Sequence, residues 1–207
     1  MRPVTRHGLL LFFSLQFPSA IVGDLDSLRD DVRVFFKDAG RTEIVHVPDQ
    51  DSTDFTKALR WLRNESVTRS CDPMDVIALG GLGGRVDQAF SIIHHLLKAI
   101  DDRELLCGDM YLLSEQSLSF VLDKGRNIIH GLAPGQNKVF QENVGIIPIR
   151  GAAEITTSGL EWDVKDWKTE FGGQISTSNH IKADVVEVNS SEQVLLTIEL
   201  ADALCTT

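Results

Sequence analysis

The 207-residue sequence is poor in several residue types, and each shortage excludes a class of protein. It has only three cysteines, Cys71, Cys107 and Cys205, and they form no C-x-x-C pair. A disulfide-held scaffold is therefore excluded, a zinc site has no support, and the odd number of thiols fits a reducing compartment such as the cytoplasm. Glycine (16 residues) and proline (6 residues) are too few for a collagen-like chain.

Positive charge is also scarce. The chain has 20 Lys and Arg against 30 Asp and Glu, for a formal net charge of −10. A protein with this excess of negative charge repels the phosphate backbone of nucleic acids, so we expect no nucleic-acid partner. Acidic side chains grouped in one site can still recruit a divalent cation, and the cation can recruit an anion. A nucleotide ligand is therefore not excluded.

Long apolar runs are missing as well. The run at residues 8–15 is too short for a bilayer span, which needs about 20 apolar residues, so we expect no membrane segment. Arg2 and Arg6 precede this run and small residues follow it, as in a secretory signal peptide. Cleavage after Ala20 would leave the chain starting inside an apolar strand. The alternative, that residues 1–18 are an irregular or truncated start, predicts that residues 8–17 pack against an open edge or face of the sheet.

Residues 19–123 alternate between two apolar periodicities. Short apolar runs at residues 19–23, 43–47, 75–80 and 110–113 predict strands, whereas helical spacing at residues 27–39, 53–64 and 86–100 predicts amphipathic helices. This alternation predicts a mostly parallel, three-layer α/β domain. The strand at 75–80 lacks polar alternation, so we expect both of its faces to be covered. The inward face predicted for the third helix consists of Val86, Phe90, Ile93, Leu97 and Ile100.

The pattern changes near residue 123. Helical spacing disappears, and short strands are predicted at residues 127–130, 144–149, 172–176, 184–188 and 194–199. Several of them mix apolar and polar residues in the way that is typical of half-exposed strands. We therefore expect a separate all-β sandwich or barrel over residues 124–207.

Three motifs directly follow predicted strands of the α/β part. Residues 23–27 read Gly-Asp-Leu-Asp-Ser, residues 49–54 read Asp-Gln-Asp-Ser-Thr-Asp, and residues 80–88 read Gly-Gly-Leu-Gly-Gly-Arg-Val-Asp-Gln. Ligands of open α/β sheets bind beyond the carboxyl ends of the strands, which is where these motifs fall. Each motif also has a structural alternative. Asp24, Asp26 or Asp51 could cap the next helix, and the glycines could simply form a tight crossover.

The combination of the motifs favours a site. Carboxylates that converge on one sheet edge repel each other unless a cation is present. Six aspartates would converge here: Asp24, Asp26, Asp49, Asp51, Asp54 and Asp87. Their hard oxygen atoms suit Mg²⁺, especially Mg²⁺ shared with substrate phosphates, and glycine amides at a helix start bind anions. With Lys57 and Arg85 nearby, the pattern predicts metal-dependent phosphoryl transfer, although the glycine loop is not a Walker A motif.

In this order, the three motifs resemble those of the thiamine pyrophosphokinase family. Two further segments add to the resemblance: residues 157–162 (Thr-Ser-Gly-Leu-Glu-Trp) are similar to its Thr-Gly-Leu-x-Trp, and residues 176–179 (Ser-Thr-Ser-Asn) to its Ser-Thr-Ser-Asn. The resemblance extends over about residues 19–200. It implies a homodimer with composite sites, a thiamine-binding β-sandwich, and transfer of the pyrophosphoryl group of ATP to thiamine, giving thiamine diphosphate and AMP.

The resemblance also implies roles for individual residues. Asp54, Asp87, Arg85 and Lys57 would be catalytic, and the six aspartates named above would hold Mg²⁺. Trp162 would stack on a thiamine ring, while Ser178 and Asn179 would hydrogen-bond the aminopyrimidine. The implied substrate-binding residues are Gly80, Gly81, Gly83, Gly84, Gln50, Thr53, Gln88, Trp162, Ser176, Ser178 and Asn179. His94 and His95 receive no role.

One feature departs from the family pattern. The family has a further strand and helix, with an Asp-Gly-Gly-Ala-Asn-like loop, before the first motif, and this sequence has no such unit. The alternatives to an active enzyme are a weakly active or inactive homologue that only binds thiamine or its phosphates, and a Mg²⁺-dependent phosphotransferase for another heterocyclic alcohol. In the second part, Trp162 could be packing only, and residues 176–179 could be only a turn.

Overall fold

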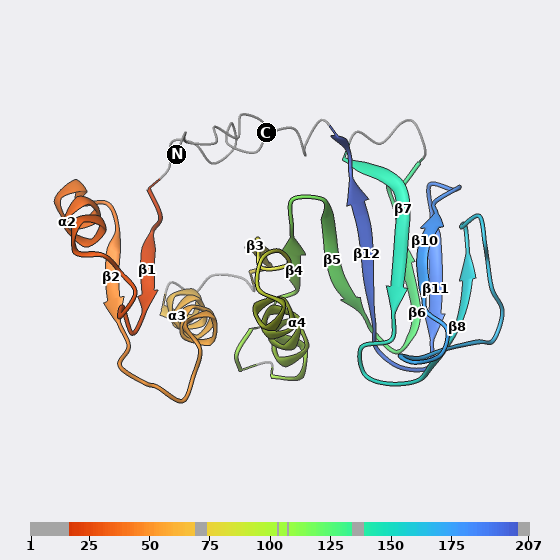
Figure 1. The fold of residues 1–207 in the computed structure, drawn as a ribbon, viewed down its shortest axis with the longest axis horizontal. Coiled ribbons are helices and arrows are strands. Elements are labelled where there is room, and N and C mark those ends of the chain that lie inside the picture. The colour runs from red at the N-terminus through yellow and green to blue at the C-terminus, as the bar shows by residue number, and fades with distance from the viewer. Residues whose placement is uncertain (1–16, 69–73, 103, 107, 134–138, 203–207) are drawn as a thin grey trace. The chain divides into compact units, whose positions relative to one another are not determined.

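The computed structural model describes residues 17–68, 74–102, 104–106, 108–133 and 139–202 (Figure 1). The predicted packing of residues 8–17 lies, apart from Phe17, outside the described residues, as do the three cysteines. Contacts divide the chain into two units. We call the described residues within 17–76 and 93–110 the N-terminal unit, and those within 77–92 and 111–202 the β-rich unit. Within the described residues, no helix is both long and apolar enough to cross a membrane.

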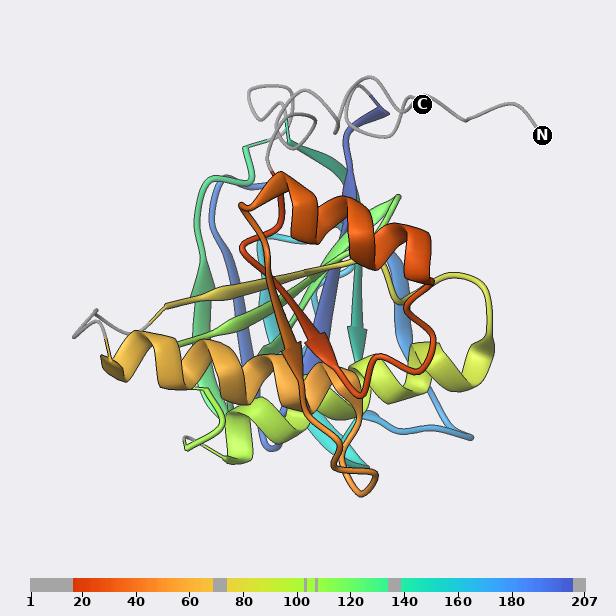
Figure 2. The ribbon, with the colours of Figure 1, turned by 90° about the vertical axis from the view of Figure 1, so that its left-hand side faces the viewer.

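The N-terminal unit contains a strand–helix–strand–helix sequence. Strands β1 (Ala20–Gly23) and β2 (Glu43–His46) pair in parallel and are joined by helix α2 (Asp30–Ala39). Helix α3 (Asp54–Thr68) follows β2. Figure 2 and Figure 1 both show the β1–β2 pair between α2 and α3. The α2 helix stops at Gly40, which adopts the left-handed conformation (φ 64°) typical of a helix C-terminus and donates its N–H to the Lys37 carbonyl.

The β-rich unit consists mainly of two sheets. The six-stranded sheet has the order β10-β7-β12-β5-β4-β3, and the four-stranded sheet has the order β6-β11-β8-β9 (Figure 1). The strands of the first sheet are β3 (Val76–Leu79), β4 (Met110–Leu113), β5 (Ser117–Leu122), β7 (Phe140–Ile147), β10 (Ser176–His180) and β12 (Val194–Leu200). The strands of the second are β6 (Gly125–Ile129), β8 (Ala153–Ser158), β9 (Trp167–Thr169) and β11 (Val186–Ser190).

An apolar core forms between these two sheets. β12 contributes Val194, Leu196 and Ile198, and β11 contributes Val186 and Val188, all of them nearly inaccessible to solvent. The pairs β4–β5, β5–β12, β12–β7 and β7–β10 are antiparallel, as are the pairs of the smaller sheet. An α/β part followed by a β-sandwich is thus confirmed. Parallel pairing is described for β1 and β2.

Several sequence predictions were wrong in detail. Residues 172–176 were predicted to be a strand, but a turn at Gly172 (φ 86°) occupies most of this range and β10 begins only at Ser176. Strands β5, β8 and β9 were not predicted. β3 was expected to be covered on both faces, but it is an edge strand with Ile77 and Leu79 exposed.

The predicted inward face of helix α4 (Val86–Asp101) was also partly wrong. Val86 and Phe90 are exposed, with Phe90 at 66%, whereas His95, Leu96 and Ala99 are buried. The boundary between the two units runs through this helix. The spacing of apolar residues predicts which residues share a helix face, but it does not predict which part of that face is buried against the rest of the fold.

Candidate functional site

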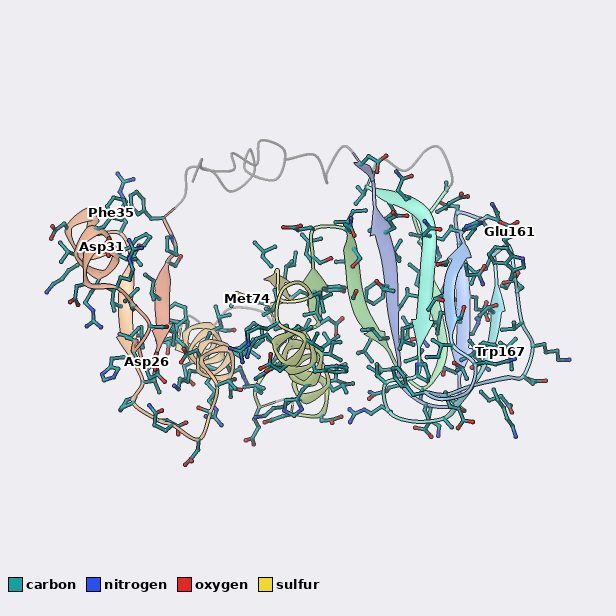
Figure 3. All side chains as sticks on the ribbon, viewed as in Figure 1. Asp26, Asp31, Phe35, Met74, Glu161 and Trp167 are labelled. Atoms are coloured by element: carbon teal, nitrogen blue, oxygen red, sulfur yellow. The ribbon has the colours of Figure 1, made fainter. Side chains whose placement is uncertain are left out.

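The first motif forms a strained turn at the end of β1. Leu25 is buried and adopts a left-handed conformation (φ 63°), which costs an ordinary L-residue about 1–2 kcal/mol. The backbone N–H of Asp26 donates to Asp24 Oδ1 at 3.3 Å and closes the turn. Figure 3 shows Asp26 beyond the carboxyl end of β1. Neither aspartate caps α2, because that helix starts at Asp30 and its N-cap position, Arg29, makes no side-chain capping bond.

Lys57 joins the first motif to the second. Its Nζ lies 3.0 Å from Asp54 Oδ1 and 3.4 Å from Asp24 Oδ2, and its side chain is only 1% exposed. The Asp24 N–H donates to Asp54 Oδ1 at 3.1 Å, and Gln50 Nε2 donates to Asp24 Oδ2 at 3.4 Å. A Cβ on Gly23 would lie 2.8 Å from the Asp54 carboxyl group, so a residue without a side chain is required there. The structure thus brings both motifs into one charged cluster.

The charges of this cluster stabilise each other. Burial of the Lys57 ammonium alone would lower its pKa, but the hydrogen bonds that it donates to Asp54 and Asp24, with the negative charge of both carboxylates, outweigh burial, and the pKa is raised. The pKa of Asp24 is lowered, chiefly by the backbone N–H of Asp26 and then by Lys57, against the opposing effect of burial. Both groups are therefore charged at neutral pH.

The rest of the second motif builds the start of α3. Asp49 accepts hydrogen bonds from the Ser52 hydroxyl and the Asp51 N–H, and both lower its pKa, the Ser52 bond most. Thr53, not Asp51, is the N-cap: its Oγ1 accepts the Thr56 N–H at 3.2 Å. The alternative in which Asp51 caps the helix is therefore wrong.

His95 is a buried residue of this region for which the sequence predicted no role. It is 2% exposed, and its Nε2 lies 2.7 Å from Thr53 Oγ1 and 3.1 Å from Thr56 Oγ1. Its ring also packs edge-on against Phe55. His95 therefore ties α4 to the first turn of α3, which contains both Asp54 and Lys57.

The third motif belongs to the β-rich unit. Gly80, Gly81 and Gly84 all have positive φ, at 82°, 86° and 77°, in the loop between β3 and α4. Arg85 forms two hydrogen bonds with Asp87, Nε to Oδ1 at 3.1 Å and Nη2 to Oδ2 at 2.6 Å, and this contact lowers the pKa of Asp87. The other five aspartates belong to the N-terminal unit, so convergence of all six stays a prediction.

The two C-terminal motifs meet within the β-rich unit. Residues 159–162 run beside residues 179–182: the Glu161 N–H donates to the His180 carbonyl at 2.8 Å, and Leu160 bridges Ile181. Gly159 (φ 96°) is needed in this turn, because a Cβ there would lie 2.5 Å from the Val185 carbonyl oxygen. The two motifs, which are separate in the sequence, therefore form one local structure.

Trp162 projects from this local structure into solvent. Its side chain is 55% exposed, and its ring centroid lies 5.0 Å from that of His180. Asn179 is buried and bonds the backbone of Trp162, while Ser178 is exposed and left-handed (φ 55°) at a bulge of β10. Trp162 is therefore not a core residue, and residues 176–179 belong to a bulged strand instead of a simple turn.

Together these features define a two-part protein, an α/β part with acidic and glycine-rich motifs and a β-sandwich that displays an indole ring. Residues 12–107 match the model of the family "Thiamin pyrophosphokinase, catalytic domain". Residues 130–195 match "Thiamin pyrophosphokinase, vitamin B1 binding domain". The chain belongs to the thiamin pyrophosphokinase family.

Individual relatives agree with this membership. Thiamine pyrophosphokinase 1 of Arabidopsis thaliana is 35% identical over 185 residues, covering 88% of this chain and 66% of the relative, slightly less than two thirds. Thiamin pyrophosphokinase 1 of Caenorhabditis elegans is 30% identical, covering 90% and 72%. The yeast thiamin pyrophosphokinase structure superposes with a TM-score of 0.81 at 26% identity, covering 92% of this chain and 72% of that one.

Proposed function

We propose that this chain acts as a thiamine pyrophosphokinase, which transfers the pyrophosphoryl group of ATP to the hydroxyl of thiamine. The observation that carries the proposal is the enclosed Lys57 ammonium between Asp54 and Asp24. It joins two acidic motifs at the end of a strand and the start of a helix, where α/β proteins bind phosphorylated ligands. The names of the relatives in Arabidopsis thaliana and Caenorhabditis elegans support the same activity.

The reaction places specific demands on the residues. The thiamine hydroxyl oxygen attacks the β-phosphorus of ATP, the bond from that phosphorus to the oxygen of the α-phosphate breaks, AMP leaves, and the hydroxyl loses its proton. Asp54 or Asp87 would accept that proton or orient the hydroxyl. Arg85 and the amides of Gly80, Gly81, Gly83 and Gly84 would stabilise negative charge on the phosphates. Lys57 would hold the Asp24 and Asp54 carboxylates in place through its two contacts.

Mg²⁺ is the metal that we propose for the phosphate end. It would supply positive charge near the phosphates, and the residues that would hold it are Asp24, Asp26, Asp49, Asp51, Asp54 and Asp87. Among the described residues, no three His, Cys, Asp or Glu side chains form a group that could hold a metal. Carboxylate chemistry nevertheless suits Mg²⁺, which commonly binds one or two carboxylates, several waters and the substrate phosphates. Gln50, Thr53 and Gln88 would contact the nucleotide.

The thiamine end would lie in the β-rich unit. Trp162 offers an exposed aromatic face, and Ser176, Ser178 and Asn179 lie on the adjoining strand. Thiamine contains a cationic thiazolium and an aminopyrimidine, and both suit stacking on an indole.

Replacement of Trp162 tests this assignment. We expect Trp162→Ala to weaken thiamine at least about tenfold with much less effect on ATP, because a stacking contact is worth on the order of 1 kcal/mol beyond buried area. Calorimetric titration with each substrate measures both affinities. Phe171→Ala, at another exposed aromatic residue of the same unit, is the matched control. Unchanged thiamine affinity in Trp162→Ala would remove Trp162 from the site.

Further proposals concern the organisation of the molecule. We propose a homodimer with composite active sites, a cytoplasmic location, and functional boundaries at residues 1–18, 19–123 and 124–207. The mostly parallel, three-layer arrangement of the α/β part stays a prediction, which the parallel β1–β2 pair supports.

The activity itself is tested by incubating the chain with ATP, Mg²⁺ and thiamine and measuring AMP and thiamine diphosphate. We expect both products in equal amounts. Thiamine binding without AMP release would instead favour the homologue that only binds thiamine. AMP release with another heterocyclic alcohol but not with thiamine would identify a different phosphotransferase.

A further inference from the structure

The side-chain amide of Asn179 is almost fully used inside the protein. Its Oδ1 accepts the backbone N–H of Trp162 at 3.1 Å and that of His180 at 2.8 Å. Its Nδ2 donates to the Trp162 carbonyl at 2.9 Å. Backbone N–H groups can only donate, so these contacts also fix which end of the amide is the oxygen. Both oxygen lone pairs and one of two N–H donors are thereby engaged.

Burial reinforces this internal role. Asn179 is only 6% exposed. Its amide bonds both the N–H and the carbonyl of Trp162, whose side chain is 55% exposed. A residue that recognised a ligand through its amide would need free hydrogen-bonding groups at the surface. Asn179 instead fixes the backbone from which the exposed indole projects.

A second set of contacts holds the ring beside the indole. His180 Nδ1 lies 2.7 Å from Glu161 Oε2, and Lys182 Nζ contacts the carboxylates of Glu161 at 3.0 Å and Glu142 at 3.2 Å. The imidazole packs on Trp162 with an interplanar angle of 43°. The His180 ring therefore supports one side of the indole, and the exposed part of the indole is available for a flat ligand to stack on.

From this geometry we infer that Asn179 is a positioning residue for the thiamine site, which acts through Trp162 and does not itself contact the ligand. The inference rests on the proposed function, because it takes thiamine as the ligand of Trp162. It changes the expectation from the family resemblance, in which Asn179 hydrogen-bonds the aminopyrimidine.

A double-mutant cycle distinguishes the two roles. Thiamine affinity is measured by calorimetry for the wild type, Trp162→Ala, Asn179→Ala and the double variant, with Thr177→Ala on the exposed side of β10 as the control. We expect each single substitution to weaken thiamine about tenfold or more, and the double variant to be no weaker than Trp162→Ala alone. Multiplied effects in the double variant would mean that Asn179 contacts thiamine independently, and would overturn the inference.

A measurement without ligand separates this inference from the proposed function. The indole N–H resonance of Trp162 is assigned by its loss in Trp162→Phe, and amide exchange is followed at Trp162 and His180. We expect Asn179→Ala to shift the resonance and speed both exchanges, while Thr177→Ala leaves them unchanged.

Asn179→Asp keeps the acceptor for both N–H groups, so it should fold and preserve their protection while losing the bond to the Trp162 carbonyl. An unaltered Trp162 signal in Asn179→Ala would overturn the positioning role. Failure of the wild type to bind thiamine would reject the proposed function. The ligand-free resonance and exchange measurements would still test whether Asn179 positions Trp162.

Discussion

Lys57 is a charged side chain in an enclosed position, and its surroundings explain how it remains charged. An ammonium without partners would be costly to bury, but Asp54 and Asp24 each contact its Nζ. The same two carboxylates would otherwise repel each other, and the N–H of Asp24 adds a further bond to Asp54. Removal of any one member leaves the other charges poorly compensated.

Asp54→Asn is the sharpest test at this scale. The amide keeps the size of the carboxylate but loses the charge opposite Lys57, so we expect turnover to fall by at least about a hundredfold with the fold retained. Steady-state AMP formation and circular dichroism measure the two effects. Asp38→Asn, on the exposed surface of α2, is the control and should behave as the wild type. Near-normal AMP formation by a folded Asp54→Asn variant would exclude Asp54 from the site.

Among the elements, α3 connects local sequence most directly to the candidate site. Thr53 is the next-to-last residue of the acidic motif; its hydroxyl accepts the Thr56 N–H at the start of the helix and contacts His95 on α4. The helix that follows immediately presents Asp54 and Lys57. The Thr53 hydroxyl therefore helps to fix the first turn of α3, on which Asp54 and Lys57 lie.

Thr53→Ala should therefore destabilise the N-terminal unit. We expect a loss of about 1 kcal/mol in the free energy of unfolding, since that is typical for removal of a helix N-cap. Thr53→Ser keeps the hydroxyl and should recover most of the loss, whereas Thr68→Ala, at the far end of the same helix, should have little effect. Urea unfolding measures all three. Equal stability of Thr53→Ala and the wild type would show that the cap bond contributes nothing.

The helices and early strands could be predicted because their apolar spacing is regular and their ends carry clear signals, such as Gly40 after α2. β5 and β8 were missed because serine and threonine occupy many of their positions, and β9 because it has only three residues. The site motifs could be recognised from residue type and order. The contacts of Lys57 with Asp24, of His95 with Thr53 and of Asn179 with Trp162 could not, because each joins residues between 17 and 42 positions apart.

At the scale of the whole molecule, contacts do not follow the boundary expected near residue 123. β5 (Ser117–Leu122) precedes that boundary yet pairs with β12 near the C-terminus, and β4 pairs with β5. The sheet of the β-rich unit is thus built from residues before and after position 123. Apolar periodicity located the change from helices to strands near residue 123, but it did not show that strands from before this position join the same sheet.

The charged cluster predicts how stability depends on pH. The pKa of Asp24 is lowered in the folded chain, so its contribution is present above the ordinary aspartate pKa and is lost as pH falls through the lowered value. The pKa of Lys57 is raised, so its contribution is present below the ordinary lysine pKa and is lost as pH rises through the raised value. We expect these contributions to be constant between about pH 5 and 9, with losses below about pH 4 and above about pH 10.

Thermal melting across this range measures the effect. The double variant Asp24→Asn/Lys57→Met should lack both pH-dependent contributions, while Asp38→Asn should keep the wild-type profile. A double variant that kept the wild-type losses of melting temperature below about pH 4 and above about pH 10 would contradict the assignment to these groups.

The bulge in β10 has a consequence for solubility. β10 is an edge strand of the six-stranded sheet, and its pairing with β7 shifts register between Ser176 and Asn179. A regular edge strand presents an even row of N–H and C=O groups on which a strand from another molecule can add, whereas a bulge interrupts that row. The distortion that turns Asn179 toward Trp162 therefore also interrupts the row on which a strand from another molecule could add, and residues 159–161 pair with the chain just beyond it.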